Sequence, residues 1–473
     1  MTEEENMHVV MLPWSAFGHL IPFLHLSIAV AKAGIRVSFV STTANLRRLP
    51  LHFIPPDLPA PLNLVELHLP TVDGPPADAE ATIDITIDQV QYLKTAYDLL
   101  KPQLKQFISH DIPNWIIQDF VPYWTSEISQ ELKVHIPLIM FSILPSTFLG
   151  PLEFLIGDAQ TKYWPSPESL TSPPEWFDFP STFAFQLFEA VPFHAGAFNR
   201  NASGTSDAER LVLTVTACEA FAVRGCREYE GQYLELLQKL YRKPVIPVGI
   251  LPAAPAPSPT EKSFPGEWLT VFKWLDQQPP KTVVFVGFGS ECKLSKDQVH
   301  EIAHGLELSG LPFIWALRKP TWAIHKDDAL PPEFMARIEG QGVVCMGWAP
   351  QMEILAHPSV GGSLIHCGWG SINENLQFGH TLVALPLAID QGLNARLLVE
   401  KGLAVEVERG EDGSFDRRDI AAALRKAMVD EEGEMLRVRA WEMATIFGDR
   451  RIHQAYMDGF IQYLKKGQKD KTG

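Results

Sequence analysis

Residues 348–391 read WAPQMEILAHPSVGGSLIHCGWGSINENLQFGHTLVALPLAIDQ. A short apolar run ends just before His366, and the Cys-Gly-Trp-Gly-Ser that follows opens a segment with helical spacing. Small residues at this turn let a ligand approach the backbone, and the free N–H groups at a helix start favour phosphate. Ser371 and Glu374 also fit a capping box, which would satisfy only some of those N–H groups. The stretch therefore predicts a strand, a phosphate-binding turn and a helix.

The same alternation of strands and helices extends outward from this stretch. Strands are predicted at 8–12, 35–40, 64–69, 115–118, 211–215, 282–287, 313–316, 342–345, 382–385 and 404–407. Helices are predicted at 21–32, 89–108 and 296–308. Strands that alternate with helices predict parallel sheets of the doubly wound type, so the fold class is α/β.

A proline-rich segment divides the chain. Residues 244–266 contain seven prolines, which predicts a stiff, extended linker. The flanking regions, 1–243 and 267–451, are predicted to form two Rossmann-like domains. A C-terminal helix at about 452–466 is expected to pack back on the first domain. In such folds a ligand binds at the carboxyl ends of the strands, and here we expect it between the two domains.

The composition excludes several classes of partner. The chain has 473 residues with 46% hydrophobic and 20% charged residues, enough to bury a sizeable core. Its net charge of -16 argues against nucleic acid or an anionic membrane as the main partner. The start of the chain is acidic, and the apolar stretch 134–152 is broken by prolines. Five cysteines without dense spacing imply no disulfide framework. We expect a cytoplasmic protein without integral membrane association.

Two residues form a candidate acid–base pair. Residues 12–22, LPWSAFGHLIP, place His19 at a helix N-terminus, with Pro22 as a first-turn residue. The positive end of the helix dipole favours a neutral imidazole, as a general base requires. Asp119 follows the apolar run 115–118 and could fix the tautomer of the imidazole at the same sheet edge. The alternatives are a capping or core histidine and an ordinary aspartate in a turn.

A second turn, 287–290, reads Gly-Phe-Gly-Ser and could also face phosphate. It does not complete G-x-G-x-x-G because position 292 is Cys, which counts against a dinucleotide dehydrogenase. The chain contains no D-x-D and no clustered Cys/His spacing. We therefore expect no metal, with amides and helix dipoles offsetting the charge of a diphosphate.

The stretch 348–391 closely resembles the 44-residue signature box of plant family 1 UDP-dependent glycosyltransferases. The match begins with WAPQ, passes through HCGW and ends with DQ. Gly18-His19 with Pro22, Asp119 and the Phe-Gly-Ser turn also match, so the resemblance covers nearly the whole chain. It implies the GT-B fold, in which an N-terminal acceptor-binding domain and a C-terminal UDP-sugar-binding domain face each other across a cleft.

The resemblance also implies residue roles in an inverting transfer, where His19 deprotonates an acceptor hydroxyl and Asp119 supports it. Trp348 would stack on uracil, the Ala349 backbone would bind its edge, and Gln351 and Glu374 would hold the ribose. The remaining donor-binding residues are Ser290, His366 and Ser371 at the diphosphate, with Gly370 nearby, and Trp369, Asp390 and Gln391 at the sugar. The acceptor-binding candidates are Phe17, Phe120, Phe141, Phe185 and Ile389. The UDP-sugar is a co-substrate, and no cofactor is implied.

Departures from the family pattern indicate a branch. Gly370 stands where most members have Asn, and Thr381 stands where Pro is usual. Gly370 and Glu291 are associated with the branch that adds a sugar to a sugar already on an aglycone. Gln391 favours UDP-glucose by family habit, and UDP-rhamnose stays an alternative. We expect a monomer that acts on a terpenoid, steroid or flavonoid glycoside.

Three competing functions are open. Direct glycosylation of an aglycone hydroxyl is possible within the same family. A UDP-sugar epimerase or hydrolase on the same fold needs no acceptor pocket, so it would leave the aromatic-rich segment 141–198 unexplained. That segment could line an acceptor pocket or form part of the core. A non-catalytic UDP-sugar-binding module would be expected to lack His19 or Asp119, and both are present.

Overall fold

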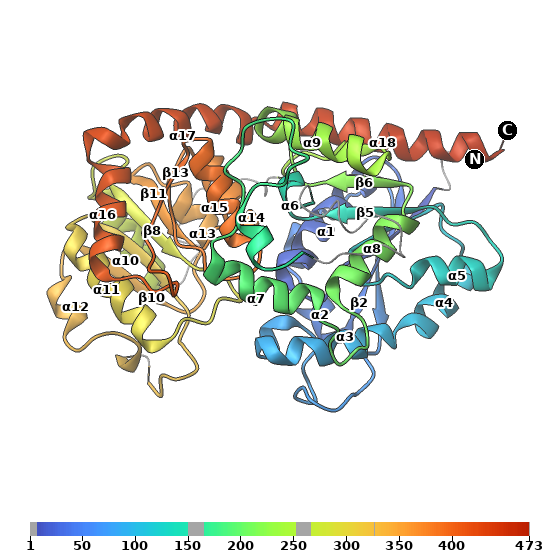
Figure 1. The fold of residues 1–473 in the computed structure, drawn as a ribbon, viewed down its shortest axis with the longest axis horizontal. Coiled ribbons are helices and arrows are strands. Elements are labelled where there is room, and N and C mark those ends of the chain that lie inside the picture. Colours follow the sequence, from blue (N-terminus) through green and yellow to red (C-terminus); the bar gives the residue numbers. More distant parts are fainter. Residues whose placement is uncertain (1–6, 150–164, 252–265, 326, 473) are drawn as a thin grey trace. The chain divides into compact units, whose positions relative to one another are not determined.

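A computed structural model describes residues 7–149, 165–251, 266–325 and 327–472 (Figure 1). The chain divides into two compact units. Unit 1 comprises residues 1–166, 194–251 and 450–473, and unit 2 comprises residues 167–193 and 252–449. Most of the predicted linker, 252–265, lies outside the described residues.

Unit 1 contains a seven-stranded parallel sheet with the strand order β3-β2-β1-β4-β5-β6-β7. Its strands are β1 (His8–Leu12), β2 (Arg36–Thr42), β3 (Leu62–Leu67), β4 (Trp115–Gln118), β5 (Leu138–Ser142), β6 (Ala220–Val223) and β7 (Val245–Pro247). Its helices are α1 (Phe17–Lys32), α2 (Thr43–Arg48), α3 (Val90–Asp98), α4 (Lys101–His110), α5 (Thr125–Leu132), α6 (Ser146–Leu149), α8 (Asp207–Ala217), α9 (Arg227–Tyr241) and α18 (Arg450–Thr472). Helix α7 (Leu187–Phe198) contains the boundary between the units.

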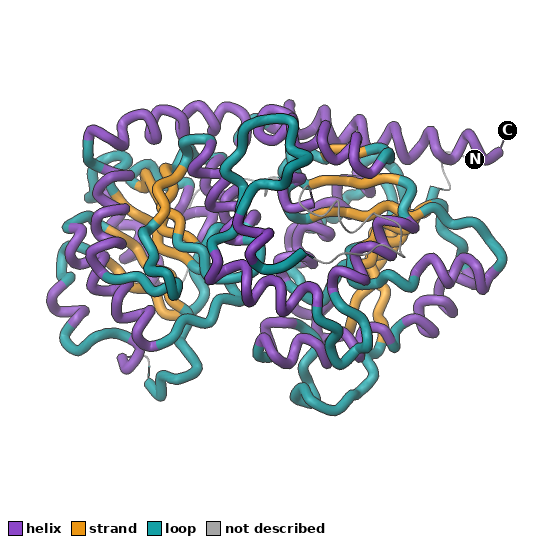
Figure 2. Tube along the Cα trace, viewed as in Figure 1, coloured by secondary structure: helices purple, strands orange, loops and turns teal. Residues whose placement is uncertain are grey.

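Unit 2 contains a six-stranded parallel sheet with the order β10-β9-β8-β11-β12-β13. Its strands are β8 (Val283–Gly287), β9 (Phe313–Leu317), β10 (Gly342–Met346), β11 (Val360–Ile365), β12 (Thr381–Ala384) and β13 (Ala404–Glu406). Its helices are α10 (Gly266–Asp276), α11 (Lys296–Ser309), α12 (Phe334–Arg337), α13 (Gln351–Leu355), α14 (Trp369–Leu376), α15 (Gln391–Glu400), α16 (Arg417–Met428) and α17 (Glu434–Phe447). Both sheets are flanked by helices (Figure 2), so the prediction of two Rossmann-like domains is confirmed.

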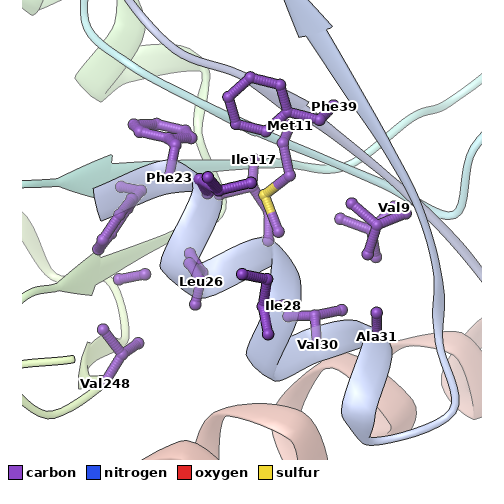
Figure 3. Packing of buried hydrophobic residues seen from close by; sticks show 14 of the residues in the cluster. Val9, Met11, Phe23, Leu26, Ile28, Val30, Ala31, Phe39, Ile117 and Val248 are labelled. Carbon is purple, nitrogen blue, oxygen red and sulfur yellow. The ribbon is translucent and has the colours of Figure 1, made fainter. Parts of the chain in front are cut away.

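The core of unit 1 forms where α1 packs on the sheet (Figure 3). Strand β1 is buried at every position, as expected for a strand covered on both faces. Helix α1 inserts Phe23 and Leu26 against side chains such as Met11 and Phe39. Helix α18 contributes Phe460 to the same cluster. The C-terminal segment therefore belongs to the core of the N-terminal sheet.

The core of unit 2 has one apolar cluster on each face of its sheet. Alternate residues of β8 point to opposite faces, with Val284 in one cluster and Phe285 in the other. Helix α11 starts at a capping box in which Ser295 accepts a hydrogen bond from the Gln298 N–H. It ends at Gly310, whose positive φ of 68° closes the helix. Helix α11 thus follows the turn at the carboxyl end of β8.

Three predicted elements differ in the structure. Residues 211–215 are helical, not a strand, because a Ser206–Glu209 capping box starts α8. The prediction of one helix over 89–108 was wrong, since α3 and α4 are separate helices and Pro102 lies in the first turn of α4. Residues 245–247 of the predicted linker form the edge strand β7.

The division into units also differs from the predicted domains, at residues 167–193 and at residues 450–451, which belong to unit 1. Residues 167–193 fall inside the predicted N-terminal domain, but they pack with unit 2. The contacts responsible involve α7 and α15 and are described below.

Candidate active site

The structure brings His19 and Asp119 together in unit 1. Strand β1 lies next to β4, so the residues that follow the two strands meet at one edge of the sheet. His19 is in the first turn of α1, and its Nδ1 lies 2.6 Å from Oδ2 of Asp119. Asp119 is 4% exposed and His19 is 20% exposed. The contact joins residues 100 positions apart, which the sequence could suggest but not establish.

Asp119 is held by backbone donors as well as by the imidazole. Its Oδ1 accepts a hydrogen bond from the Phe120 N–H at 2.7 Å, and its Oδ2 accepts one from the Trp14 N–H at 3.3 Å. Hydrogen bonds to the carboxylate compensate the cost of burying it. Because Nδ1 faces Asp119, Nε2 is the ring nitrogen on the side of the imidazole away from the carboxylate.

Helix α1 begins earlier than the sequence suggested. Its first residue is Phe17, so Pro22 is an interior residue and not part of the first turn. The backbone N–H groups of His19 and Leu20 both donate to the carbonyl of Ala16. His19 therefore keeps its predicted place at the N-terminus of the helix.

The five acceptor candidates separate into two groups. Phe17 and Phe120 are partly exposed, and the Phe120 ring lies 6.4 Å from the imidazole of His19. Ile389, in unit 2, is 56% exposed. Phe141 is 1% exposed and packs edge-on against Phe23, so it is a core residue. Phe185 is also buried, in unit 2, and packs on Phe193. Neither of the last two lines a surface.

In unit 2 the two predicted phosphate-facing turns follow the neighbouring strands β8 and β11. The turn after β8 contains Gly289 with φ of 70°, and Ser290 follows it. A Cβ atom on Gly289 would lie 2.9 Å from Cε1 of His366, and one on Gly368 would lie 2.6 Å from Nε2. The two glycines therefore let both turns close around the imidazole of His366.

His366 is neutral near neutral pH because burial lowers its pKa to about 4. A neutral imidazole can donate a hydrogen bond to a phosphate oxygen but adds no positive charge. The positive end of α14 and its backbone N–H groups are left to offset the charge of an anion.

The start of α14 corrects one prediction. The helix begins at Trp369 with Gly368 as its N-cap, so Ser371 is already inside the helix and the capping box with Glu374 does not form. Cys367 adopts a positive φ of 64°, which turns the chain into the helix early. Glu374 instead accepts a hydrogen bond from Nε2 of Gln351 at 2.6 Å. The two predicted ribose-binding side chains are thus adjacent.

Other donor-binding candidates occupy the surrounding loops. Trp348 is 74% exposed, so an aromatic face is available for stacking, and Ala349 follows it. Ser290, Gly370 and Ser371 are partly exposed. Trp369 is 3% exposed, so the protein itself covers nearly all of this residue.

Asp390 and Gln391 are fixed by their own loop. Oε1 of Gln391 accepts hydrogen bonds from the N–H groups of Leu387 and Ala388, at 2.9 and 3.0 Å. Oδ2 of Asp390 accepts one from Nδ2 of Asn394 at 2.7 Å. Asn394 also donates to the Cys367 carbonyl at 3.0 Å, which links this loop to the turn after β11.

Asn394 was missed by the sequence analysis. Its position four residues after Asp390 was the available signal, because residues at this spacing lie on one face wherever the segment is helical.

The described residues contain no group of three or more His, Cys, Asp or Glu side chains arranged to hold a metal ion. Independence from metals and cofactors stays a prediction. Over the same residues, no helix is both long and apolar enough to cross a bilayer. The five cysteines, all within the described ranges, form no disulfide bond.

A parallel α/β unit with phosphate-facing turns is typical of nucleotide-binding domains, and comparisons with known proteins define the class further. The family described as "UDP-glucoronosyl and UDP-glucosyl transferase" matches residues 269–453. The "Glycosyltransferase, N-terminal domain" family matches residues 5–109.

The chain is 41% identical to UDP-glycosyltransferase 91A1 of Arabidopsis thaliana, over 97% of each protein. It is 38% identical to soyasaponin III rhamnosyltransferase of Glycine max, over 98% of this chain and 97% of that protein. Among solved structures, Glycyrrhiza uralensis UGT73P12 complexed with glycyrrhetinic acid 3-O-monoglucuronide superposes with a TM-score of 0.76 at 22% identity. That match covers 99% of this chain and 97% of the other.

The chain therefore belongs to the plant family 1 UDP-dependent glycosyltransferases and is a transferase enzyme with the GT-B fold. The predicted family, fold and enzyme class are confirmed.

Proposed function

We propose that the enzyme transfers glucose from UDP-glucose, with inversion, to a sugar hydroxyl of a natural-product glycoside. The observation that carries the proposal is the contact between Nδ1 of His19 and the buried carboxylate of Asp119. It supports a general base whose Nδ1 is held by a carboxylate, an arrangement that neither a binding module nor a core histidine requires.

In the proposed reaction Nε2 of His19 removes the proton of the acceptor hydroxyl while that oxygen attacks the anomeric carbon. The bond between the anomeric carbon and the diphosphate oxygen breaks, and UDP leaves with the electron pair. Asp119 stabilises the imidazolium that forms. A single displacement of this kind inverts the configuration at the anomeric carbon.

Unit 2 is proposed to hold the donor. His366, Ser371 and Ser290, with the start of α14, would contact the diphosphate and stabilise the leaving group. The exposed Trp348 would stack on uracil, and the joined Gln351 and Glu374 would bind the ribose hydroxyls.

The sugar contacts are proposed to come from Trp369, Asp390 and Gln391. Since Oε1 of Gln391 is occupied by its own loop, its amide N–H groups are the atoms left to meet a sugar hydroxyl. UDP-rhamnose is the second candidate donor, because the Glycine max relative, which matches 98% of this chain, is named a rhamnosyltransferase. That relative's name also states a saponin acceptor, which supports a glycoside over an aglycone.

A transfer matrix tests the proposal. The purified enzyme is given UDP-glucose or UDP-rhamnose with flavonoid or triterpenoid aglycones and their monoglucosides, and products are identified by mass. Turnover of monoglucosides alone with UDP-glucose is the expected result. Turnover of free aglycones would overturn the acceptor assignment, and turnover with UDP-rhamnose alone would overturn the donor assignment.

Two further measurements complete the test. His19→Ala should abolish transfer while UDP binding is retained, and comparable turnover by this variant would overturn the base assignment.

We also propose a cytoplasmic monomer, and the mass from light scattering after size exclusion tests the oligomeric state.

A further inference from the structure

The segment 181–193, which we call the docking segment, packs with unit 2 although the residues before and after 167–193 belong to unit 1. Its contacts gather on α15, the helix whose first residue is Gln391. Two acidic side chains form the anchors: Glu189 of the docking segment near the start of α15, and Glu400 of α15 at its end.

Glu189 lies against the first turn of α15. Its Oε2 forms an ion pair with Arg396, and a Cβ atom added to Gly392 would lie 2.6 Å from its carboxylate atoms. Gly392 is the residue after Gln391, so only the missing side chain at this position lets the carboxylate reach the helix. A negative charge at a helix N-terminus is stabilising.

The ion pair is part of a network that is largely, though not fully, shielded from solvent. Arg396 also pairs with Glu406 of β13, and the side chains of Glu189, Arg396 and Glu406 are 12%, 11% and 17% exposed. Burial raises the pKa of Glu406, opposed by Arg396 and reinforced by the negative charge of Glu189. Removal of the Glu189 charge therefore changes the electrostatic interactions of both Arg396 and Glu406.

The neighbouring Phe188 contacts Arg409, a residue that also binds the loop before α15. The Arg409 guanidinium lies over the rings of Phe188 and Phe415, at 5.1 and 5.2 Å from their centroids. It donates a hydrogen bond to the Pro386 carbonyl at 2.6 Å. Pro386 begins the loop that ends at Asp390 and the start of α15. Phe188 and Glu189 thus reach this loop at both of its ends.

We propose that Glu189 is a positioning residue for the donor sugar, which acts by fixing the start of α15 and thereby Gln391. This inference rests on the proposed sugar contacts of Asp390 and Gln391. It assigns a role in donor binding to a segment that precedes the UDP-sugar-binding domain in the chain. The proposed contacts to uracil, ribose and diphosphate come from other loops of unit 2, so the effect should be confined to the sugar.

The test compares binding of UDP-glucose with binding of UDP alone by titration calorimetry; UDP-rhamnose replaces UDP-glucose if the transfer assay selects it. In Glu189→Gln, the Kd for UDP-glucose should rise about tenfold, as for loss of one charge-assisted hydrogen bond, while the Kd for UDP stays within twofold. An equal change in both constants would indicate a merely structural ion pair and overturn the proposal, as would no change in either.

The chain offers a matched control. Glu400 accepts hydrogen bonds from the Ser181 hydroxyl at 2.8 Å and the Thr182 N–H at 2.7 Å, so it joins the same segment to the far end of α15. Glu400→Gln makes the same chemical change and should leave both constants unchanged. If it reproduced the Glu189→Gln result, docking in general and not the start of α15 would be responsible, and the proposal would fail.

Two further variants keep the proposal falsifiable. Gly392→Ala retains every charge but displaces the carboxylate, and it should reproduce the selective loss even if Glu189→Gln folds poorly. Gln391→Ala in the same titration tests the proposed sugar contact of Gln391 separately from the positioning role of Glu189. If Gln391→Ala weakens binding of UDP-glucose and not of UDP, while Glu189→Gln and Gly392→Ala change neither, the role of Glu189 is refuted and the sugar contact of Gln391 stands. If it has no effect, the proposed sugar contact fails.

Discussion

Replacement of Asp119 by Asn tests how the geometry of unit 1 produces catalysis. The Nδ1···Oδ2 distance of 2.6 Å implies charge centres about 4 Å apart in the imidazolium state, worth about 4 kcal/mol at an effective dielectric constant near 20. An amide retains a neutral hydrogen bond worth about 1 kcal/mol, so about 3 kcal/mol of transition-state stabilisation should be lost. That energy corresponds to a fall in kcat of roughly 100-fold.

The loss should appear in kcat because the imidazolium exists only as the proton is transferred. The assay is steady-state transfer to the acceptor found in the transfer matrix, combined with calorimetric titration of UDP. The Kd for UDP should not change, since the proposed UDP contacts come from unit 2. A protein melting curve close to that of the wild type would exclude misfolding as the cause.

Asp111→Asn is the matched control. Asp111 precedes β4 at the amino end of the strand, pairs with Arg36 and lies 3.6 Å from Nδ1 of His8. The same substitution beside another histidine should leave kcat near the wild-type value. The reasoning would be refuted if Asp119→Asn kept kcat within threefold of the wild type, or if the two variants lost activity equally.

Three more outcomes are expected. Glu374→Ala should weaken UDP binding by about 1.5–3 kcal/mol through loss of a charge-assisted hydrogen bond; unchanged affinity in calorimetry would limit Glu374 to its contact with Gln351. Gly289→Ala should weaken UDP binding about tenfold, because φ is 70° and the new Cβ would meet His366; affinity equal to the wild type would show that the turn adapts. Burial lowers the pKa of His380 to about 3, below its value of about 6.5 in the unfolded chain. The unfolded chain therefore binds a proton at His380 in a pH range where the folded protein does not. The contribution of His380 to the free energy of unfolding is complete above about pH 6.5 and is lost as pH falls toward 3. Urea unfolding between pH 7 and 5 should show a shallower pH slope for His380→Asn, and equal slopes would contradict this assignment.

The sequence alone determined the fold class and the family. Buried parallel strands read as short apolar runs, and the turns after them carry glycines and polar residues within a few positions, so both signals are local. The resemblance of residues 348–391 to the family signature placed Gln351 and Glu374 in one predicted site. Errors arose where local patterns are ambiguous, as at residues 211–215, where an apolar run is the buried face of a capped helix.

Only the tertiary structure decided which distant residues meet. His19 and Asp119 come together because β1 and β4 are neighbours in the sheet, an order that short-range patterns do not encode. The same holds for Phe141, whose burial against Phe23 depends on how α1 packs. Glu189 reaches α15 because Gly392 leaves room and Arg396 supplies the charge. Such contacts depend on packing between elements far apart in the chain, whereas periodicity and turn chemistry report only on neighbours along it.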